Sequence, residues 1–193
     1  MFTVKWVKKE IFVMEYTGKL PGRISVDHVG YTVPDLDKAL DLFINVFGCQ
    51  LVFRGGPYDD AGYVWPGESK PASTPMRMAM VTHGGTINIE LLEYDNVLQE
   101  RVEAPRPCER GGCHICFYAQ DIQAVTEILK KRDDVMVMGE VEKEIGGATD
   151  GTEWIYMVTT WGLVIELIKW EPGKLPYEKE TSERMIPPPW KRP

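Results

Sequence analysis

The sequence predicts an α+β fold that consists of two βαβββ modules. The main observation is a short pattern that occurs twice, because apolar segments that start at a histidine and end at an aspartate are found at 28–35 and 114–121. Each segment runs directly into a stretch whose apolar residues recur at helical spacing, and three further apolar segments follow each stretch. The repeat therefore divides most of the chain into two equivalent halves.

Both predicted helices have recognisable ends. In the first, at 35–47, Asp35 is a candidate N-cap and Gly48 a candidate stop. The second helix, at 121–132, repeats this plan after Asp121 and ends in basic residues, which suit the negative end of a helix dipole. Each helix has one apolar face, so we expect it to pack on the sheet of its own half.

Three strands are predicted after each helix. Those of the first half are 50–54, 76–82 and 86–94, and those of the second half are 135–138, 154–159 and 162–170. His83, Gly84 and Gly85 form a hairpin turn by composition, and we expect His83 to be exposed and to have no role. The stretch Gly55–Pro75, rich in Gly, Pro, Ser and Asp, is predicted to be a lid or binding loop.

The repeat also sets the predicted domain boundaries. The first module is 25–94 and the second is 113–170, with a connector at 95–112. An N-terminal extension at 1–24 and a proline-rich tail at 171–193 lie outside the repeat. We expect these terminal segments to wrap the surface or a partner subunit, and we predict a homodimer.

Composition and charge exclude several classes of partner. The chain has 193 residues and a formal net charge of −7 at pH 7, which disfavours the broad cationic surface that nucleic acid requires. It lacks the run of about 18 apolar residues that a membrane helix needs. Charged residues interrupt the first 24 positions, so no signal peptide is predicted and we expect a cytoplasmic protein.

Four cysteines, too few for a disulfide framework in a chain of this length, are predicted to be reduced and buried: Cys49, Cys108, Cys113 and Cys116. The last two match a C-x-x-C motif. They lie on a predicted strand, however, where positions three apart face opposite sides of the sheet. A zinc knuckle or a dithiol switch is therefore disfavoured.

Strand alternation places a histidine and a glutamate of each half on the face opposite the helix. Glu90 shares its face with Asn88, and Glu166 shares its face with apolar neighbours. A carboxylate in such surroundings is costly unless it is paired, protonated or bound to a metal. His28 and His114 occupy matching positions in the first strand of each half.

These four side chains form a candidate metal site if the concave faces of the two halves pack together. Two imidazoles and two carboxylates suit one divalent transition metal (Ni, Co, Fe, Mn or Zn), with two positions left for water or substrate oxygens. The alternative is that the histidines are core residues and that the glutamates pair with arginines across a dimer. Because the pair recurs in both halves, the metal site is favoured.

The same segments carry a family resemblance. Val-Asp-His-Val-Gly-Tyr-Thr-Val-Pro-Asp at 26–35, Ile-Glu-Leu-Leu-Glu at 89–93, Gly-Gly-Cys-His-Ile-Cys-Phe at 111–117 and Trp-Gly-Leu-Val-Ile-Glu-Leu at 161–167 resemble the vicinal oxygen chelate superfamily. This superfamily includes glyoxalase I, methylmalonyl-CoA epimerase, extradiol dioxygenases and bleomycin-resistance proteins. Lactoylglutathione lyase-like and methylmalonyl-CoA epimerase-like members are the most similar.

The resemblance implies a cupped mixed sheet around a metal held by His28, Glu90, His114 and Glu166. It also implies a metal-dependent isomerase, epimerase or lyase that removes a proton next to a metal-bound carbonyl of a small oxo-acid or thioester. Glu166 is the first candidate for the base and Glu90 the second. Candidate substrate-binding residues are Asn88 and Tyr118, on predicted inward faces, and Trp154 and Tyr156, which share a face.

Two other functions fit the same residues. A non-haem Fe(II) ring-cleaving dioxygenase would use His28, His114 and Glu166 as its 2-His-1-carboxylate triad, although Glu90 would then occupy a position that O2 and substrate need. A non-catalytic resistance protein would bind a small molecule without turnover. Oxygen consumption with catechols and metal analysis of the purified protein distinguish these possibilities from the isomerase.

Overall fold

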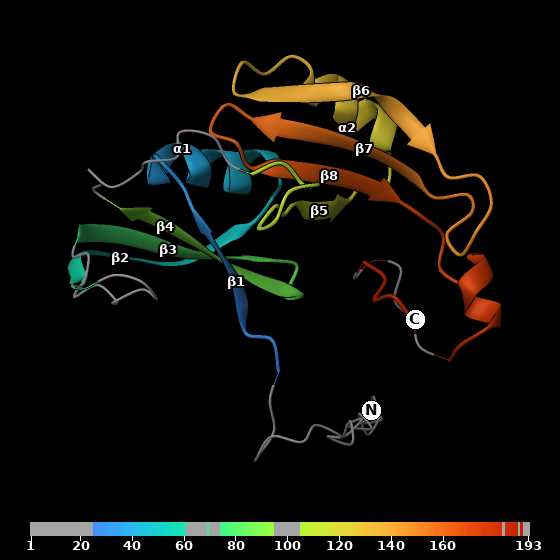
Figure 1. The fold of residues 1–193 in the computed structure, drawn as a ribbon, viewed down its shortest axis with the longest axis horizontal. Coiled ribbons are helices and arrows are strands. Elements are labelled where there is room, and N and C mark those ends of the chain that lie inside the picture. The colour runs from blue at the N-terminus through green and yellow to red at the C-terminus, as the bar shows by residue number, and fades with distance from the viewer. Residues whose placement is uncertain are drawn as a thin grey trace, which may run out of the picture.

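The computed structural model describes residues 25–60, 69, 74–94, 105–182, 184–188 and 190, and Figure 1 shows its fold. Within these residues the strands form two four-stranded sheets, with the orders β1-β4-β3-β2 and β5-β8-β7-β6. In each sheet the first pair is parallel and the other two pairs are antiparallel. The predicted α+β class with two βαβββ modules is confirmed.

The elements follow one plan in both modules. The first contains β1 (His28–Thr32), α1 (Leu36–Asp41), the π-helical turn η1 (Leu42–Val46), β2 (Gln50–Asp60), β3 (Thr74–His83) and β4 (Ile87–Tyr94). The second contains β5 (Ile115–Tyr118), α2 (Ile122–Leu129), β6 (Val135–Lys143), β7 (Glu153–Thr159) and β8 (Val164–Lys169), followed by the 3-10 helix η2 (Pro176–Lys179).

Both helices begin where the sequence predicts. The Asp35 carboxylate accepts hydrogen bonds from the backbone N–H groups of Asp37 and Lys38, and the Asp121 carboxylate accepts one from Ala124. Their ends differ from the prediction, because the first helix widens into η1 after Asp41 and the second leaves regular α geometry after Leu129. Bonds between residues three apart tighten the chain after α2.

The predicted loop Gly55–Pro75 is partly strand. β2 and β3 continue to pair beyond Gly55, with Tyr58 opposite Met76. A register shift between Gly55 and Tyr58 accommodates Pro57, which cannot donate to the sheet. The prediction of a loop at these positions is therefore wrong, and most of the remaining candidate lid lies outside the described residues, as do the N-terminal extension and positions 95–104 of the connector.

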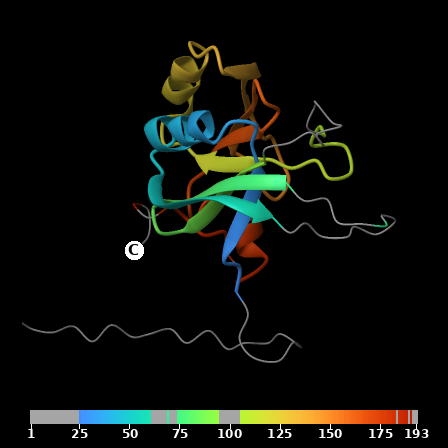
Figure 2. The same ribbon diagram turned by 90° about the vertical axis from the view of Figure 1, so that its left-hand side faces the viewer.

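One apolar core joins the two modules. The Phe47 ring from the first module stacks on the Phe117 ring of β5, with centroids 4.3 Å apart, and Phe43 packs against both rings. Figure 2 shows α1 and α2 next to each other on one side of the molecule. Because the helices cover one face of each sheet, the alternate strand residues lie on the opposite face.

Two expectations about single residues are wrong. His83 is partly buried rather than exposed, because the end of β3 lies beside β5 and the His83 ring meets Phe117 edge-on at 5.6 Å. Of the four free cysteines only Cys49 is buried, and burial raises its pKa to about 11. The other three are exposed: Cys108 lies on a turn, Cys113 just before β5, and Cys116 within β5.

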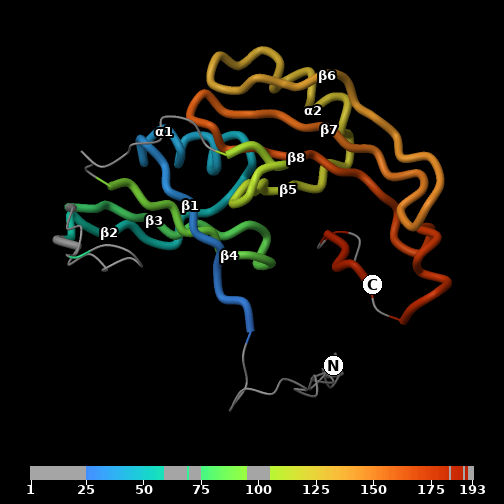
Figure 3. The backbone as a smooth tube through the Cα atoms, viewed as in Figure 1, coloured from blue at the N-terminus to red at the C-terminus, as the bar shows by residue number. Residues whose placement is uncertain are grey.

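The C-terminal tail turns back after η2 and returns toward β5 and β8, as the tube in Figure 3 shows. Met185 donates its backbone N–H to the Tyr177 hydroxyl at 2.9 Å, and the Trp190 ring meets Tyr118 at 5.9 Å. The tail therefore packs on its own second module. In the part of the chain that the structure describes, every helix is too short or too polar to span a lipid bilayer.

Candidate metal centre and adjoining cavities

The first module brings His28 and Glu90 together. β1 runs parallel to β4, and this register places Gly30 opposite Glu90. His28 Nε2 lies 3.5 Å from Glu90 Oε2, while His28 Nδ1 lies 2.7 Å from Asp27 Oδ1. The hydrogen bond with Asp27 is the main cause that raises the pKa of His28. A carboxylate on the second imidazole nitrogen is the arrangement that orients histidine ligands in metal sites.

The second module repeats this pair with closer neighbours. His114 Nε2 lies 3.0 Å from Glu166 Oε2. The register places Cys116 and Tyr156 on either side of Glu166, and interaction with its carboxylate contributes, after burial, to raising the pKa of both groups. Burial, followed by the charge of Glu166, raises the pKa of Tyr156. The His114 ring meets the Tyr156 ring edge-on at 5.5 Å.

The two carboxylates are largely shielded from solvent, with side-chain exposures of 19% for Glu90 and 13% for Glu166. The structure brings the four predicted ligands together as two pairs, one in each module. Among the described residues, no group of three or more His, Cys, Asp or Glu side chains gathers closely enough to hold a metal ion. Each pair supplies one imidazole nitrogen and one carboxylate, and the combined donor set fits a divalent transition metal.

A cavity of about 210 Å³ opens beside Glu166. Tyr156 and Trp154 line it from β7, with their rings 5.5 Å apart. The sequence pattern does not determine which face of the sheet Trp154 and Tyr156 occupy. The structure places both on the face that carries Glu166. Ile168 from β8 and Met185 from the tail complete this side of the cavity.

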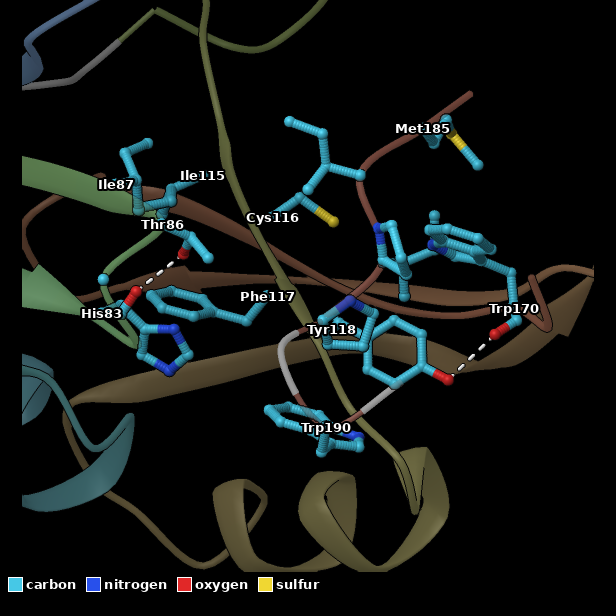
Figure 4. Close-up of a pocket in the computed structure, with 15 residues that line it drawn as sticks. His83, Thr86, Ile87, Ile115, Cys116, Phe117, Tyr118, Trp170, Met185 and Trp190 are labelled. Atoms are coloured by element: carbon cyan, nitrogen blue, oxygen red, sulfur yellow. Dashed lines mark hydrogen bonds between the residues drawn. The ribbon is translucent and has the colours of Figure 1, made fainter. Parts of the chain in front are cut away.

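The other two candidate substrate residues lie elsewhere. The Asn88 amide donates to the Asp27 carbonyl at 3.2 Å, at the start of β1. Tyr118 lines a larger cavity of about 620 Å³, shown in Figure 4, and its hydroxyl donates to the Trp170 carbonyl at 2.9 Å. Ile168 and Met185 border both cavities, so the two spaces adjoin.

Several residues around Glu166 are absent from the sequence-based candidates: Cys116, which lies opposite Glu166 in the sheet and lines the larger cavity, and Glu144, Thr149, Thr152 and Met185 in the wall of the smaller one. Strand alternation already places Cys116 on the face of His114, so a signal for it existed. Thr152 shares the alternation of Trp154 and Tyr156 and precedes them. Met185 comes from a segment without periodicity, and no pattern in the sequence points to it.

Comparison with known proteins agrees with this geometry. Residues 27–156 match the model of the Glyoxalase/Bleomycin resistance protein/Dioxygenase superfamily. The chain is also 36% identical over 175 residues to a 2-epi-5-epi-valiolone epimerase from Actinomyces sp., an alignment that covers 89% of this chain and 93% of that protein. These matches confirm the resemblance that the sequence motifs carry.

Solved structures have the same fold. A glyoxalase family protein from Bacillus cereus superposes with a TM-score of 0.59 at 24% identity, covering 77% of this chain and 95% of that one. Glyoxalase I from Leishmania major superposes with a TM-score of 0.52 at 17% identity, covering 76% of this chain and 87% of that one. At these identities the likeness describes the fold alone.

Proposed function

The chain belongs to the glyoxalase/bleomycin resistance/dioxygenase superfamily, and from this premise we propose that it is an epimerase that inverts a carbon next to a carbonyl group. The observation that carries the proposal is the histidine–glutamate pair that each module holds on the same face of its sheet. The epimerase from Actinomyces sp., at 36% identity, supports this chemistry over the other activities of the superfamily.

We propose that His28, Glu90, His114 and Glu166 hold one divalent transition metal. The chemistry of these donors suits Ni, Co, Fe, Mn or Zn. When bound, such an ion stabilises negative charge that develops on a substrate oxygen. Asp27 would fix the orientation of the His28 ring through its bond to Nδ1.

The glutamates are the proposed acid and base. Glu166 removes the proton from the carbon next to the carbonyl, the electron pair of the broken C–H bond forms a C=C bond, and the π pair of the carbonyl moves to its oxygen. Glu90, protonated before the step, is the proposed donor to the opposite face of that carbon as the carbonyl re-forms. Exchange with solvent then returns Glu166 to the carboxylate and Glu90 to the acid. Tyr156 and Cys116 would orient Glu166, because the register places them on either side of it and each carries a group that can donate to a carboxylate.

Proton exchange tests this function directly. The purified protein, supplied in turn with each divalent metal, is incubated in D2O with 2-epi-5-epi-valiolone, small 2-oxo acids and thioesters, and NMR follows the signal next to the carbonyl. We expect exchange and inversion at that carbon for one substrate class. Absence of exchange with every substrate and metal would contradict the proposal.

The predicted homodimer has a test of its own. His28→Gln and His114→Gln variants are each expected to be inactive, and the two proteins are mixed under conditions that exchange subunits. If a metal centre takes one pair from each copy, the mixture regains activity, because one of its two centres is intact. If one chain completes the centre, the mixture stays inactive, and sedimentation alone then reports the oligomeric state.

The alternative functions give different results in the same preparations. A ring-cleaving dioxygenase would consume oxygen with catechols under Fe(II), whereas the proposed epimerase would not. A binding protein without turnover would show no bound transition metal and no affinity for one. Elemental analysis of protein purified without chelators therefore separates the third function from the first two.

A further inference from the structure

The larger cavity, of about 620 Å³, has no part in the proposed epimerase chemistry. None of the four proposed metal ligands lines it, whereas Glu166 lines the smaller cavity beside it. Cavities that bind small molecules usually measure about 300 to 1,000 Å³. The larger cavity therefore has room for a ligand of its own.

Aromatic rings form much of the wall of this cavity. They come from the end of β3, from β5, from the residue that follows β8 and from the C-terminal tail, and Figure 4 shows them: His83, Phe117, Tyr118, Trp170 and Trp190. The Tyr118 ring meets the Trp170 ring at 6.1 Å and the Trp190 ring at 5.9 Å, both edge-on. Such walls suit another aromatic ring, which packs against faces and edges of this kind.

The charge of the wall restricts the ligand further. None of the described residues that line the larger cavity is a lysine, an arginine, an aspartate or a glutamate. The cation that we propose on Glu166 has all its ligands outside this lining. A charged ligand would find only the imidazole of His83 as a partner, and only in its protonated form. Because burial of an unpaired charge is costly, the cavity favours an uncharged molecule.

One polar group of the wall is left for a ligand. The Tyr118 hydroxyl already donates to the Trp170 carbonyl at 2.9 Å, and the Thr86 hydroxyl donates to the His83 carbonyl at 2.7 Å. Trp170 is only 6% exposed, and among the described residues nothing accepts from its indole N–H. This nitrogen is not fully enclosed, unlike Thr152 Oγ1. A ligand in the cavity can supply the acceptor that a buried indole normally has.

The C-terminal tail closes the cavity on the side of β5. Met185 donates its backbone N–H to the Tyr177 hydroxyl, Pro188 is buried, and the Trp190 ring packs on Tyr118. Trp190 itself is 54% exposed, so its own N–H can bond water. The cavity is therefore complete only while the tail packs on the second module.

We propose that the larger cavity is a second binding site, separate from the metal centre, and that it takes an uncharged aromatic molecule with one hydrogen-bond acceptor for the Trp170 indole. This inference goes beyond the proposed epimerase function, since binding at this site requires neither the metal nor the glutamates. The rings of the wall hold the ligand by packing, and the indole N–H fixes its orientation.

Three probes of one skeleton test the chemistry of the site. Naphthalene has no polar atom, quinoline has one acceptor nitrogen, and 1-naphthoate has a negative charge. Equilibrium dialysis measures their dissociation constants at mildly alkaline pH, where quinoline is neutral, with and without a chelator. We expect both uncharged probes to bind, 1-naphthoate to bind more weakly than either, and the chelator to change nothing.

Trp170→Phe keeps an aromatic ring and removes the N–H. Because water solvates quinoline better than naphthalene, the ratio of their dissociation constants is compared between proteins rather than within one. Relative to naphthalene, quinoline should bind about 5- to 10-fold more weakly to Trp170→Phe than to the wild type. Trp154→Phe is the matched control, since Trp154 lines only the smaller cavity, and it should keep the wild-type ratio.

Trp190→Ala keeps the proposal testable if Trp170→Phe fails to fold, because Trp190 is largely exposed. Loss of this wall should weaken binding of naphthalene and quinoline by about 3- to 10-fold each, without changing their ratio. An unchanged ratio in Trp170→Phe or unchanged affinities in Trp190→Ala would overturn the proposal. It would also be overturned if neither uncharged probe bound, if 1-naphthoate bound most tightly, or if binding required the metal.

Discussion

The two modules have the same topology and the same histidine–glutamate pair, but they surround the glutamate differently. Glu166 lies between Cys116 and Tyr156, whose thiol and hydroxyl can both donate to it. Glu90 lies between Gly30 and Met80, neither of which has a side-chain donor. The second module thus places two side chains with donor groups beside its carboxylate, whereas the first places none.

In the first module the polar support is on the histidine instead. Asp27 holds His28 Nδ1 at 2.7 Å. A Cβ atom added at Gly30 would lie 3.4 Å from Glu90 Oε2, so the glycine leaves only the space of one ordinary contact. The comparison teaches that a repeated pair can be supported from opposite ends, through the imidazole in one module and through the carboxylate in the other.

The largest expected effect comes from the glutamates themselves. Glu90→Gln and Glu166→Gln keep the size of the side chain and remove the base, so each should lower the rate of proton exchange by about 100-fold or more. NMR in D2O measures the rate, and circular dichroism checks the fold. A near-normal rate of proton exchange in either variant would show that the substituted glutamate is not needed for the reaction, and that the two modules do not both supply a catalytic carboxylate.

Support through the imidazole predicts the next largest effect. Asp27→Asn should weaken metal binding by about 10- to 100-fold, because the His28 ring loses its charged partner. Competition with a coloured chelator measures the affinity. Asp37→Asn is a control, since Asp37 is also exposed and pairs with Arg54 rather than with a predicted ligand. Equal metal affinity in Asp27→Asn and the control would remove Asp27 from the site.

Support through the carboxylate predicts a smaller effect on metal and a specific effect on turnover. Tyr156→Phe removes one donor near Glu166 and keeps the ring that packs against His114 and Trp154. We expect kcat to fall by about 10-fold, the lower end for one hydrogen bond to a charged group, with little change in metal content. If the Tyr156→Phe protein loses its metal, the Tyr156 hydroxyl is needed for metal binding and its role is not limited to turnover.

Gly30→Ala tests the space beside Glu90 in the first module, and its expected effect is smaller again. Alanine loses less chain entropy than glycine when a strand forms, and the added Cβ makes only ordinary contact with Glu90. We therefore expect the free energy of unfolding to increase by about 0.5 kcal/mol. Chemical denaturation measures this change. A destabilised Gly30→Ala variant would show that the space beside Glu90 is already filled.

The smallest effect concerns an ion pair of the second module at its boundary with the first. Arg132 pairs with Asp134 at 2.6 Å and reaches Asp41 of the first module at 3.7 Å. The hydrogen bond with Arg132 lowers the pKa of Asp134 below its ordinary value of 3.8. This carboxylate therefore stabilises the fold at pH values above 3.8, and its contribution is lost as the pH falls through the lowered pKa.

Thermal unfolding of Asp134→Asn between neutral and acidic pH checks that sign. The difference in melting temperature between wild type and variant should be greatest at neutral pH and should shrink toward zero in acid. A difference that grows as the pH falls would contradict the direction of the shift.

Much of this arrangement follows from the sequence. The repeat around His28 and His114 predicts the modules, and strand alternation places each glutamate on the face of its histidine, because period-two geometry is local. The N-caps at Asp35 and Asp121 are also local features, and the structure has both.

Other features depend on contacts between distant segments, which local patterns do not encode. Pro57 and its neighbours have loop-like composition, yet pairing with β3 makes them strand. His83 is shielded only because β5 lies beside the end of β3. Met185 reaches the Glu166 cavity through a tail whose prolines carry no periodicity, and the unpaired state of Thr152 appears only once the neighbours of its hydroxyl are known.

The metal content of single-module variants tests the central claim most directly, namely that the two pairs form one centre. Elemental analysis is made on wild type, His28→Gln and His114→Gln purified without chelators. We predict about one transition-metal ion per chain in the wild type and nearly none in either variant, because one imidazole and one carboxylate are too few ligands to retain the ion. Undiminished metal in either variant, or a wild type that binds no transition metal, would contradict the account.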